Sequence, residues 1–282
     1  MSDRRGNAGR NVLVLLTGSY PANIEDASFI RNEINQLAEA FDVVYVYSFD
    51  PIGGETLPLP ENVEYKGSLK EIPRSTGTKA LSKPGSLGRA WRALSQEVRA
   101  GRLKGNAGRV LGNIFSGTRF ASAIMKNLKP DDKISVYAFW GTDGAMALPF
   151  LPASFRKTMR LHRFDLYEEE SEFLPLRGSL LTQLDNVVPI SEDGRQYLLQ
   201  RYGDLLDDGR LKLARLGTRD HGVGPAPRDN QAFSFASCSS EIPVKRDSSI
   251  IPALQLIAEH RPVKWTHFGS GALFDELAQV AD

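Results

Sequence analysis

The chain has 282 residues, of which 41% are hydrophobic and 24% are charged, and its 35 basic and 34 acidic residues give a net charge of +1. These values are typical of a globular protein of about two domains and exclude disordered, collagen-like and coiled-coil chains. The near-zero net charge argues against a general nucleic-acid-binding protein. The single cysteine, Cys238, excludes an internal disulfide and a cysteine-based zinc site, and it fits a reducing cytoplasm.

The first fifty residues have the pattern of a strand, a helix and a second strand. Residues 11–17 and 43–47 are short apolar runs typical of strands buried on both faces. Between them, Asp26 and Ser28 are candidate helix N-caps. Apolar residues then recur at helical spacing, namely Phe29, Ile30, Ile34, Leu37 and Ala38, up to Phe41. A helical crossover makes the joined strands parallel, so we expect a doubly wound α/β domain.

A basic region follows a segment, residues 51–84, that is rich in proline, glycine and serine and is expected to be largely loop, with one strand at 62–65. From Lys66 to Lys126 the chain has thirteen basic and two acidic residues. An amphipathic helix is predicted here, because Leu87, Trp91, Leu94 and Val98 form an apolar stripe at helical spacing. Arg89, Arg92 and Arg99 lie off that stripe. A second helix is predicted at 107–128.

The alternation of strands and helices continues to the end of the sequence. Strands are predicted at 134–139, 158–162, 186–190 and 210–216, and helices at 144–150, 179–184 and 193–202. These complete an N-terminal Rossmann-like domain, residues 1–216. Residues 217–230 have the composition of a linker. Beyond it we expect strands at 233–237 and 263–268 and helices at 248–260 and 273–280. Only about 50 residues, 231–282, follow the linker, so the second Rossmann-like domain is expected to be incomplete.

Candidate site residues follow predicted strands, because ligands of open parallel sheets bind beyond the carboxyl ends of the strands. Gly18 and Ser19 form a loop after the first strand, while His162 ends the strand predicted at 158–162 and Asp165 follows three residues later. The histidine could hydrogen-bond a sugar or a phosphate, with its tautomer set by the carboxylate. The alternative is a histidine satisfied within a structural network at the strand end. The loop likewise is either a phosphate-binding loop or only a tight turn.

In the second domain, two cations and two glycines also follow predicted strands. Lys245 and Arg246 follow its first strand and suit a diphosphate, although a surface basic pair is the alternative. Gly269 and Gly271 follow its second strand and could bring backbone N–H groups close to a nucleotide. No Asp-x-Asp pair is present, so a metal-dependent transferase is disfavoured and no metal or other cofactor is expected.

Taken in order, these segments resemble the retaining glycosyltransferases of family 4, which have the GT-B fold, especially bacterial enzymes of capsular and extracellular polysaccharide synthesis. The segments are LTGSYPANIEDASFIRNEINQLAEAFDVVYVYSF, SVYAFWGTDGAMALPFL, RLHRFDLYEEE, VVPISEDGRQYLLQRYG, SCSSEIPVKR and VKWTHFGSGALFDEL. The resemblance implies an acceptor-binding first domain and a second domain that binds a nucleotide-diphosphate sugar, with metal-independent transfer of a hexose to a lipid-linked saccharide.

The resemblance also implies roles for three residues. His162 matches a histidine near the donor sugar, Gly18 matches the loop that meets the acceptor and the phosphates, and Lys245 matches a lysine that steadies the leaving diphosphate. Two departures stand against these matches. Ser240 occupies a position where many family members have arginine, and the family's paired glutamates lie downstream of the last residue here. The alternative function is therefore a non-catalytic sugar-nucleotide binder or a truncated partner in a polysaccharide-assembly complex.

The basic helix leaves two interpretations open. Trp91 with Arg89, Arg92 and Arg99 either lies on the anionic inner face of the plasma membrane, where a lipid-linked acceptor is found, or belongs to a helix packed on the core with a solvated basic face. RNA binding ranks last, because few aromatic residues interrupt the basic ones. A GT-B sugar-nucleotide epimerase shares the architecture, but the segments HRFDLY and ISEDGRQYL resemble the transferases.

Overall fold

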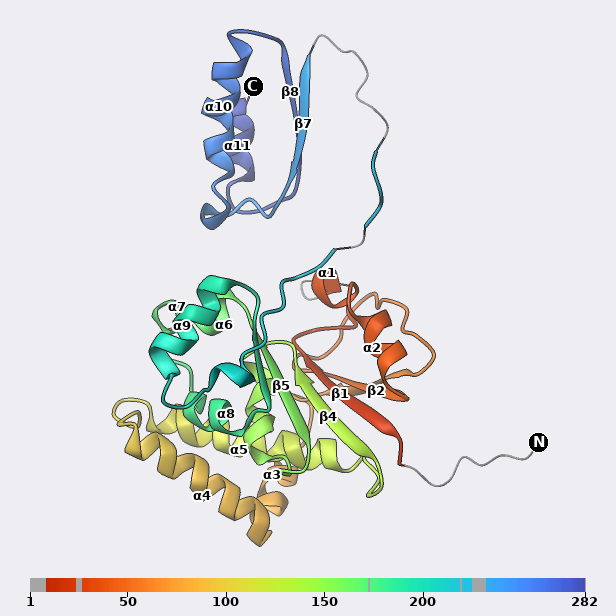
Figure 1. The fold of residues 1–282 in the computed structure, drawn as a ribbon, viewed down its shortest axis with the longest axis vertical. Coiled ribbons are helices and arrows are strands. Elements are labelled where there is room, and N and C mark those ends of the chain that lie inside the picture. Colours follow the sequence, from red (N-terminus) through yellow and green to blue (C-terminus); the bar gives the residue numbers. More distant parts are fainter. Residues whose placement is uncertain (1–8, 24–26, 172, 219, 225–231, 282) are drawn as a thin grey trace, which may run out of the picture. The chain divides into compact units, whose positions relative to one another are not determined.

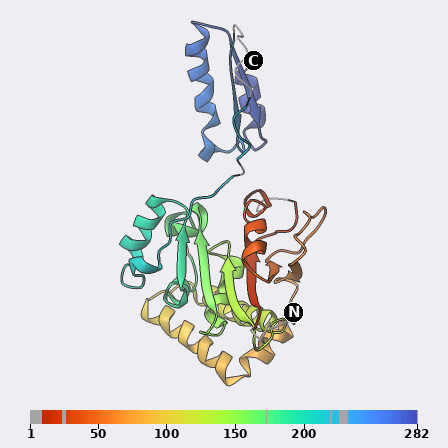
Figure 2. The same cartoon turned by 45° about the vertical axis from the view of Figure 1, so that its right-hand side comes forward.

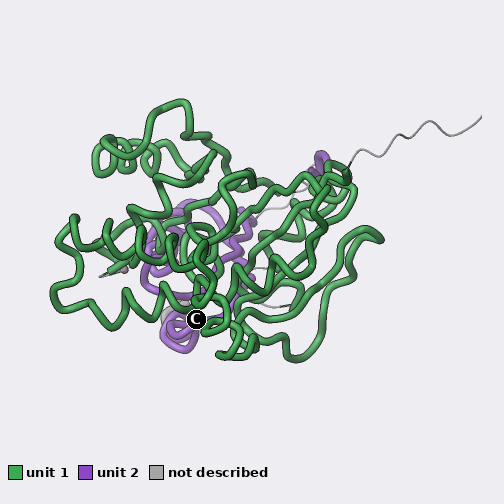
Figure 3. Tube along the Cα trace, turned by 90° about the horizontal axis from the view of Figure 1, so that it is seen from below, with its two compact units in different colours: residues 1–219 green, residues 220–282 purple. Residues whose placement is uncertain are grey.

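The computed structural model describes residues 9–23, 27–171, 173–218, 220–224 and 232–281 (Figure 1). The chain divides into two compact units, Met1–Arg219 and Asp220–Asp282, which Figure 3 shows in different colours. The division falls in the segment predicted as a linker, residues 217–230. Parts of that segment, residue 219 and residues 225–230, lie outside the described residues.

Unit 1 is built on a six-stranded sheet in the order β3-β2-β1-β4-β5-β6. Every neighbouring pair in this sheet is parallel. The strands are β1 (Asn11–Thr17), β2 (Val43–Ser48), β3 (Val63–Ser68), β4 (Lys133–Ala138), β5 (Arg156–Leu161) and β6 (Asn186–Pro189). The predicted doubly wound parallel domain is confirmed, because the strand order runs outward from β1 through β2 and β3 on one side and through β4, β5 and β6 on the other.

Helices cover both faces of this sheet (Figures 1 and 2). They are α1 (Ala27–Ile30), α2 (Ile34–Ala40), α3 (Arg74–Leu81), α4 (Pro84–Arg99), α5 (Ala107–Met125), α6 (Arg163–Leu166), α7 (Glu168–Ser171), α8 (Arg177–Gln183) and α9 (Glu192–Tyr202). Two 3₁₀ helices are η1 (Asp143–Phe150) and η2 (Asp208–Arg210). Helices α3 to α5 lie together on the side of unit 1 away from α1 and α2.

The central strand β1 separates two hydrophobic clusters. Alternate side chains of a strand point to opposite faces of the sheet. Val12, Val14 and Leu16 accordingly join the larger cluster with α4, α5 and η1, whereas Leu13 and Leu15 join a smaller cluster with α1 and α2. A strand buried on both faces must be apolar at every position, which explains why β1 is a continuous apolar run.

Two predicted helices and one predicted loop segment differ from the structure. The helix expected to end near Phe41 is broken between α1 and α2, where Asn32 and Glu33 make backbone hydrogen bonds of the tighter i→i−3 type. Of its predicted caps, Asp26 lies outside the described residues and Ser28 lies inside α1. Residues 144–150 form 3₁₀ rather than α-helix, with Pro149 inside the segment. A third difference is α3, which occupies a segment expected to be loop.

The strand predicted at 210–216 is wrong. Leu211 forms only an isolated parallel bridge with Val187. The backbone N–H groups of Lys212 and Ala214 still donate to carbonyl oxygens of β6. The ladder does not become regular, because β6 has four residues and its last one, Pro189, lacks the N–H donor that a continuing ladder needs.

Unit 2 contains two consecutive strand–helix repeats. Strand β7 (Phe233–Cys238) pairs in parallel with β8 (Val263–Phe268). The helices are α10 (Ile250–Ala258) and α11 (Phe274–Ala281), with the short 3₁₀ helices η3 (Pro243–Lys245) and η4 (Asp247–Ser249) after β7. Both predicted strands and both predicted helices of this segment are therefore present.

Candidate functional site

The carboxyl ends of β1 and β4 flank the point where the strand order of unit 1 reverses. Ligands of open α/β sheets bind at such a point, because adjacent crossovers on opposite faces leave a crevice there. The predicted residues Gly18 and Ser19 follow β1, and His162 and Asp165 follow β5. All four residues therefore lie at the same edge of one parallel sheet.

The loop after β1 is bonded to its neighbours through its backbone. The carbonyl oxygen of Gly18 accepts hydrogen bonds from Phe49 N and Asp50 N, both at 2.9 Å. Thr17 Oγ1 donates to the carbonyl oxygen of Tyr20 at 3.0 Å, and Ser19 is buried. These hydrogen bonds attach the loop after β1 to the residues that follow β2.

His162 lies at the end of β5 with 5% of its surface exposed. Its ring centroid is 4.1 Å from that of Trp140 and 5.1 Å from that of Phe139. Among the described residues, neither ring nitrogen has a hydrogen-bond partner. Buried polar groups are normally paired, so an imidazole of this kind suits a ligand that supplies the missing partner.

Asp165 has a different environment, although it lies only three residues further along. Its side chain is fully buried and accepts hydrogen bonds from His162 N at 2.5 Å and Gly141 N at 2.6 Å. The distance from Asp165 Oδ2 to His162 Nδ1 is 3.7 Å, which is too long for a hydrogen bond. Arg177, whose pKa burial lowers, donates to the Asp165 backbone oxygen. The carboxylate of Asp165 therefore holds the backbone around His162 and makes no hydrogen bond to its ring.

Two residues that the sequence analysis did not select, Thr142 and Asp143, lie at the carboxyl end of β4. Asp143 has a left-handed backbone, with φ at 54°. Burial raises the pKa of its carboxyl group, the hydrogen bond from Thr142 opposes that shift, and the charge of Asp50 adds to it. The Thr142 Oγ1 to Asp143 Oδ2 distance is 3.3 Å. The sequence signal was the run Gly-Thr-Asp-Gly, which begins two residues after the predicted strand at 134–139 and is typical of a turn.

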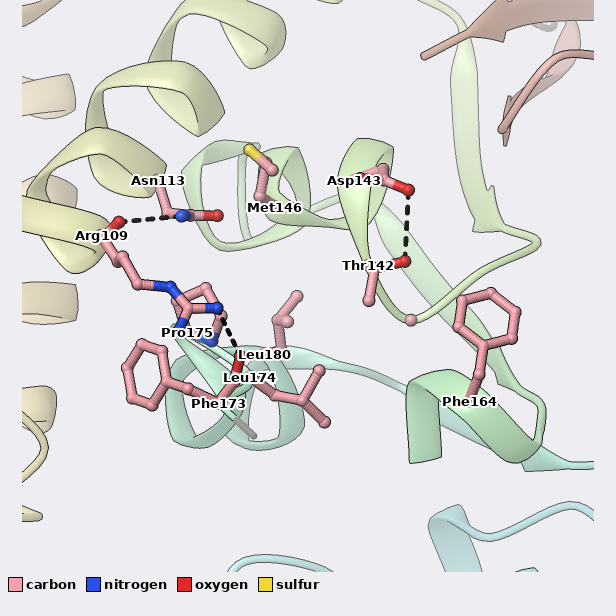
Figure 4. A pocket seen from close by; sticks show the side chains of 11 residues that line it. Arg109, Asn113, Thr142, Asp143, Met146, Phe164, Phe173, Leu174, Pro175 and Leu180 are labelled. Carbon is pink, nitrogen blue, oxygen red and sulfur yellow. Dashed lines mark hydrogen bonds between the residues drawn. The ribbon is translucent and has the colours of Figure 1, made fainter. Parts of the chain in front are cut away.

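A pocket of about 280 Å³ opens beside this turn (Figure 4). Its walls come from α5, the turn after β4, η1, α6, the segment before α8 and α8 itself. The lining residues are Arg109, Asn113, Gly141, Thr142, Asp143, Met146, Phe164, Phe173, Leu174, Pro175 and Leu180. The pocket therefore combines a few polar groups with apolar and aromatic walls, as small-molecule sites do.

The carboxyl edge of unit 2 carries the predicted cations and glycines. Lys245 ends η3, and Arg246 follows it with φ at 57°, and both side chains are exposed. A Cβ on Gly269 would lie 1.9 Å from Ser239 O, and one on Gly271 would lie 2.3 Å from Glu241 O. The two glycines are therefore required by close packing of the loop after β8 against the loop after β7.

Four polar residues of unit 2 were missed by the sequence analysis. Glu241 is 4% exposed, and its Oε1 lies 3.4 Å from His267 Nε2. Ser239 Oγ donates to the buried carboxylate of Asp247 at 2.8 Å. Ser240, at the position of the family's arginine, is exposed between them. These contacts hold the loop that precedes Lys245. Because residue 240 is serine, this loop lacks the cation that an arginine would place there.

In the part of the chain that the structure describes, no group of three or more His, Cys, Asp or Glu residues could hold a metal ion. Over the same residues, no helix combines the length and the apolar character that crossing a bilayer demands.

Comparison with known proteins gives structural likeness without sequence likeness. No protein-family model and no curated protein sequence matches the chain. The structure of TarM has a TM-score of 0.57 and 11% identity, over 95% of this chain and 73% of TarM. The lipopolysaccharide outer core galactosyltransferase WaaB, without ligand, has a TM-score of 0.55 and 9% identity, over 96% of this chain and 64% of WaaB.

A third similar structure is the catalytic domain of starch synthase IV from Arabidopsis thaliana, bound to ADP and acarbose. Its TM-score is 0.53 and its identity is 9%, over 96% of this chain and 70% of that one. This chain spans less than two thirds of the length of WaaB. It spans 34% of the length of an S. aureus TarM G117R mutant, whose TM-score is 0.43. These likenesses show that the fold is that of the GT-B glycosyltransferases, with Rossmann-like architecture.

Proposed function

We propose that the chain is a glycosyltransferase of family 4 type, which moves a hexose from a nucleotide-diphosphate sugar to a saccharide acceptor with retention of configuration and without a metal ion. The observation that carries the proposal is His162, a buried imidazole with two unpartnered nitrogens at the ligand-binding edge of a GT-B-type domain. The similar starch synthase structure contains ADP, and WaaB is named as a galactosyltransferase. Both names are consistent with a sugar-nucleotide donor.

Each candidate residue then has a defined task. As the bond between the sugar and the diphosphate breaks, negative charge collects on the leaving diphosphate. Lys245 and Arg246 are exposed cations that neutralise it, which is electrostatic stabilisation of the transition state. His162 donates a hydrogen bond that orients the donor sugar, and the acceptor hydroxyl bonds to the anomeric carbon as its proton leaves with the diphosphate. Asp165 acts through the backbone of His162 and is a positioning residue.

Thermal-shift titration of the 282-residue chain with a panel of nucleotide-diphosphate sugars tests this proposal, because a ligand that binds the native state stabilises it. We expect a shift with one nucleotide class, lost in Lys245→Ala and retained in Lys264→Ala, which removes an exposed cation from β8. Release of nucleotide diphosphate in the presence of acceptor then separates a transferase from a non-catalytic sugar-nucleotide binder. Absence of any shift would contradict a donor site in this chain.

We further propose that the acceptor is lipid-linked and that the chain binds the anionic inner face of the plasma membrane. Helix α4 packs on unit 1 through Ala90, Ala93 and Glu97. Leu87, Trp91 and Val98 are 57%, 70% and 54% exposed, so most of the predicted apolar stripe faces solvent. Leu94 is the exception, since it packs against the core.

An exposed apolar stripe beside exposed arginines is typical of helices that lie in a membrane interface. Arg92 and Arg99 are exposed, while Arg89 is half-buried. Of the two acids in the basic region, Glu97 is buried, which leaves the cationic surface almost uncompensated. Plain core packing, the other interpretation of this stripe, does not account for the exposure of Trp91.

Sedimentation with vesicles tests the membrane proposal. We expect binding to vesicles rich in phosphatidylglycerol and little binding to pure phosphatidylcholine. The double variant Leu87→Ser and Trp91→Ser and the double variant Arg92→Gln and Arg99→Gln should each reduce binding about tenfold or more, because apolar insertion and charge both contribute. Leu256→Ser, which removes an exposed leucine of unit 2, is the matched control. Unchanged binding of both double variants would contradict a membrane role for α4.

A further inference from the structure

The pocket beside the turn after β4 has four polar side chains on opposite walls. Arg109 and Asn113 stand one helical turn apart on α5, and Thr142 and Asp143 stand across from them (Figure 4). Asn113 Nδ2 donates to the backbone oxygen of Arg109 at 2.8 Å, which directs its amide oxygen away from that oxygen. The pocket therefore offers a cation, a carboxylate and an amide oxygen to one ligand.

Neither charge in this pocket forms an ion pair with another described residue, and the charge of Lys70 acts on Asp143 only from beyond ion-pair distance. Among the described residues, Arg109 makes no ion pair, and its guanidinium only donates at 3.4 Å to the Phe173 backbone oxygen and lies 5.1 Å from the Phe173 ring. Asp143 has no cation within ion-pair distance in the same residues, and one of its oxygens accepts only from Thr142. A half-buried carboxylate without a paired cation is costly unless a ligand supplies hydrogen bonds to it.

An aromatic row connects this pocket to His162. The ring of Phe164, which lines the pocket and is 52% exposed, lies 5.1 Å from the ring of Trp140. Trp140 in turn lies 4.1 Å from His162. Gly141, another lining residue, donates to the same Asp165 carboxylate that holds the His162 backbone. A ligand in the pocket would therefore extend toward the proposed reaction centre along aromatic surfaces.

We propose that this pocket binds the terminal sugar of the acceptor and selects a sugar that carries an anionic substituent, a carboxylate or a phosphate. The inference rests on the proposed function and adds the chemical class of its acceptor. Arg109 pairs with the anionic substituent, since a guanidinium matches both groups with two parallel hydrogen bonds. Asp143 and the amide oxygen of Asn113 accept hydrogen bonds from sugar hydroxyls, and the Phe164 ring covers an apolar face of the sugar.

Calorimetric titration of the full chain with methyl β-glucuronide, glucose 6-phosphate and methyl β-glucoside tests the proposal and separates the two anions. We expect at least one anionic sugar to bind about tenfold more tightly than the neutral glucoside. Arg109→Gln should abolish this preference while the affinity for the neutral glucoside remains. Asp143→Asn should weaken the binding of all three sugars. Lys104→Gln, which removes a nearby exposed cation outside the pocket, should change none of these affinities.

Two outcomes would overturn the proposal. One is equal or undetectable binding of all three sugars by the parent chain, and the other is a preference for anionic sugars that persists in Arg109→Gln. The nucleotide-sugar thermal shift, measured on the same samples, keeps this result separate from the proposed function. Sugar binding without a nucleotide shift would contradict the donor site alone, and a nucleotide shift without sugar binding would contradict the pocket alone.

Discussion

The carboxylate of Asp165 joins the turn after β4 to the turn after β5, because it accepts hydrogen bonds from both Gly141 N and His162 N, at 2.6 and 2.5 Å. The carboxylate is fully buried, so water cannot replace it as the hydrogen-bond acceptor of the two amides if the side chain is removed. The Trp140 ring and the Thr142 side chain belong to the first turn and His162 to the second. One side chain therefore ties the turn that lines the pocket to the turn that carries His162.

Asp165→Ala is expected to lower the free energy of unfolding by about 3 kcal/mol, because two buried N–H groups lose a charged acceptor. Urea denaturation of the full chain measures the change. Asp208→Ala is the control, since Asp208 forms an ion pair with Arg195 while 65% of its side chain is exposed, and its loss should cost less than about 1 kcal/mol. Similar small effects in both variants would show that Asp165 does not hold the two turns.

His162→Leu is expected to behave in the opposite way. Its ring nitrogens make no hydrogen bond within the described residues, so leucine of similar volume removes packing only and should change the free energy of unfolding by less than about 1.5 kcal/mol. Transfer of sugar should fall by about a hundredfold or more, because the orienting hydrogen bond to the donor is lost. Denaturation together with a transfer assay measures both quantities. A variant that transfers normally would remove His162 from the proposed mechanism.

Much of unit 1 could be predicted from the sequence because strands buried on both faces are continuous apolar runs. Such runs located β1 and β2, while β4, β5 and β6 were predicted from less continuous apolar segments, and a parallel sheet then places Gly18 and His162 at one edge. The environment of Asp165 could not be predicted, because its partner Gly141 belongs to another strand end. Spacing showed that Leu87, Trp91 and Val98 share one face of α4 but not that Ala90 and Ala93 form the packed face.

The pocket proposed to bind the acceptor was missed for a similar reason. Arg109 and Phe173 come from segments more than sixty residues apart that meet only in the folded chain. Asp143 looked like an ordinary turn residue, since aspartate tolerates a left-handed backbone well. Only the structure shows that its carboxylate is half-buried beside a pocket.

Gly269→Ala is expected to destabilise unit 2 strongly. The added Cβ would lie 1.9 Å from Ser239 O and 2.7 Å from His267 Nε2, so two loops would have to move apart. We expect a loss of about 3 kcal/mol, as is typical of forced overpacking against backbone. Gly224→Ala is the matched control, because nothing lies within 4 Å of a Cβ at that glycine. Equal stability of both variants, measured by limited proteolysis of unit 2, would contradict the close packing of the two loops.

Asp143→Asn is expected to stabilise the chain at neutral pH. Burial raises the pKa of this carboxyl group in the folded state, so the folded state disfavours the charged form. The resulting loss of stability is absent below the ordinary carboxyl pKa of about 4 and complete above the raised value. Asparagine keeps the shape, tolerates the left-handed backbone and can donate to Thr142 Oγ1, but it carries no charge.

The gain in stability of Asp143→Asn should therefore be largest near pH 7 and should disappear as the pH falls toward about 4. Thermal denaturation of both chains across this range measures it. Asp204→Asn, which changes an exposed carboxylate after α9, should show no pH-dependent gain. The same Asp143 variant is expected to bind acceptor sugars less well. A binding residue is expected to have a carboxylate that reduces stability but improves ligand binding. A gain in stability of Asp143→Asn that is equal at pH 4 and pH 7 would show that the charge of Asp143 does not destabilise the fold.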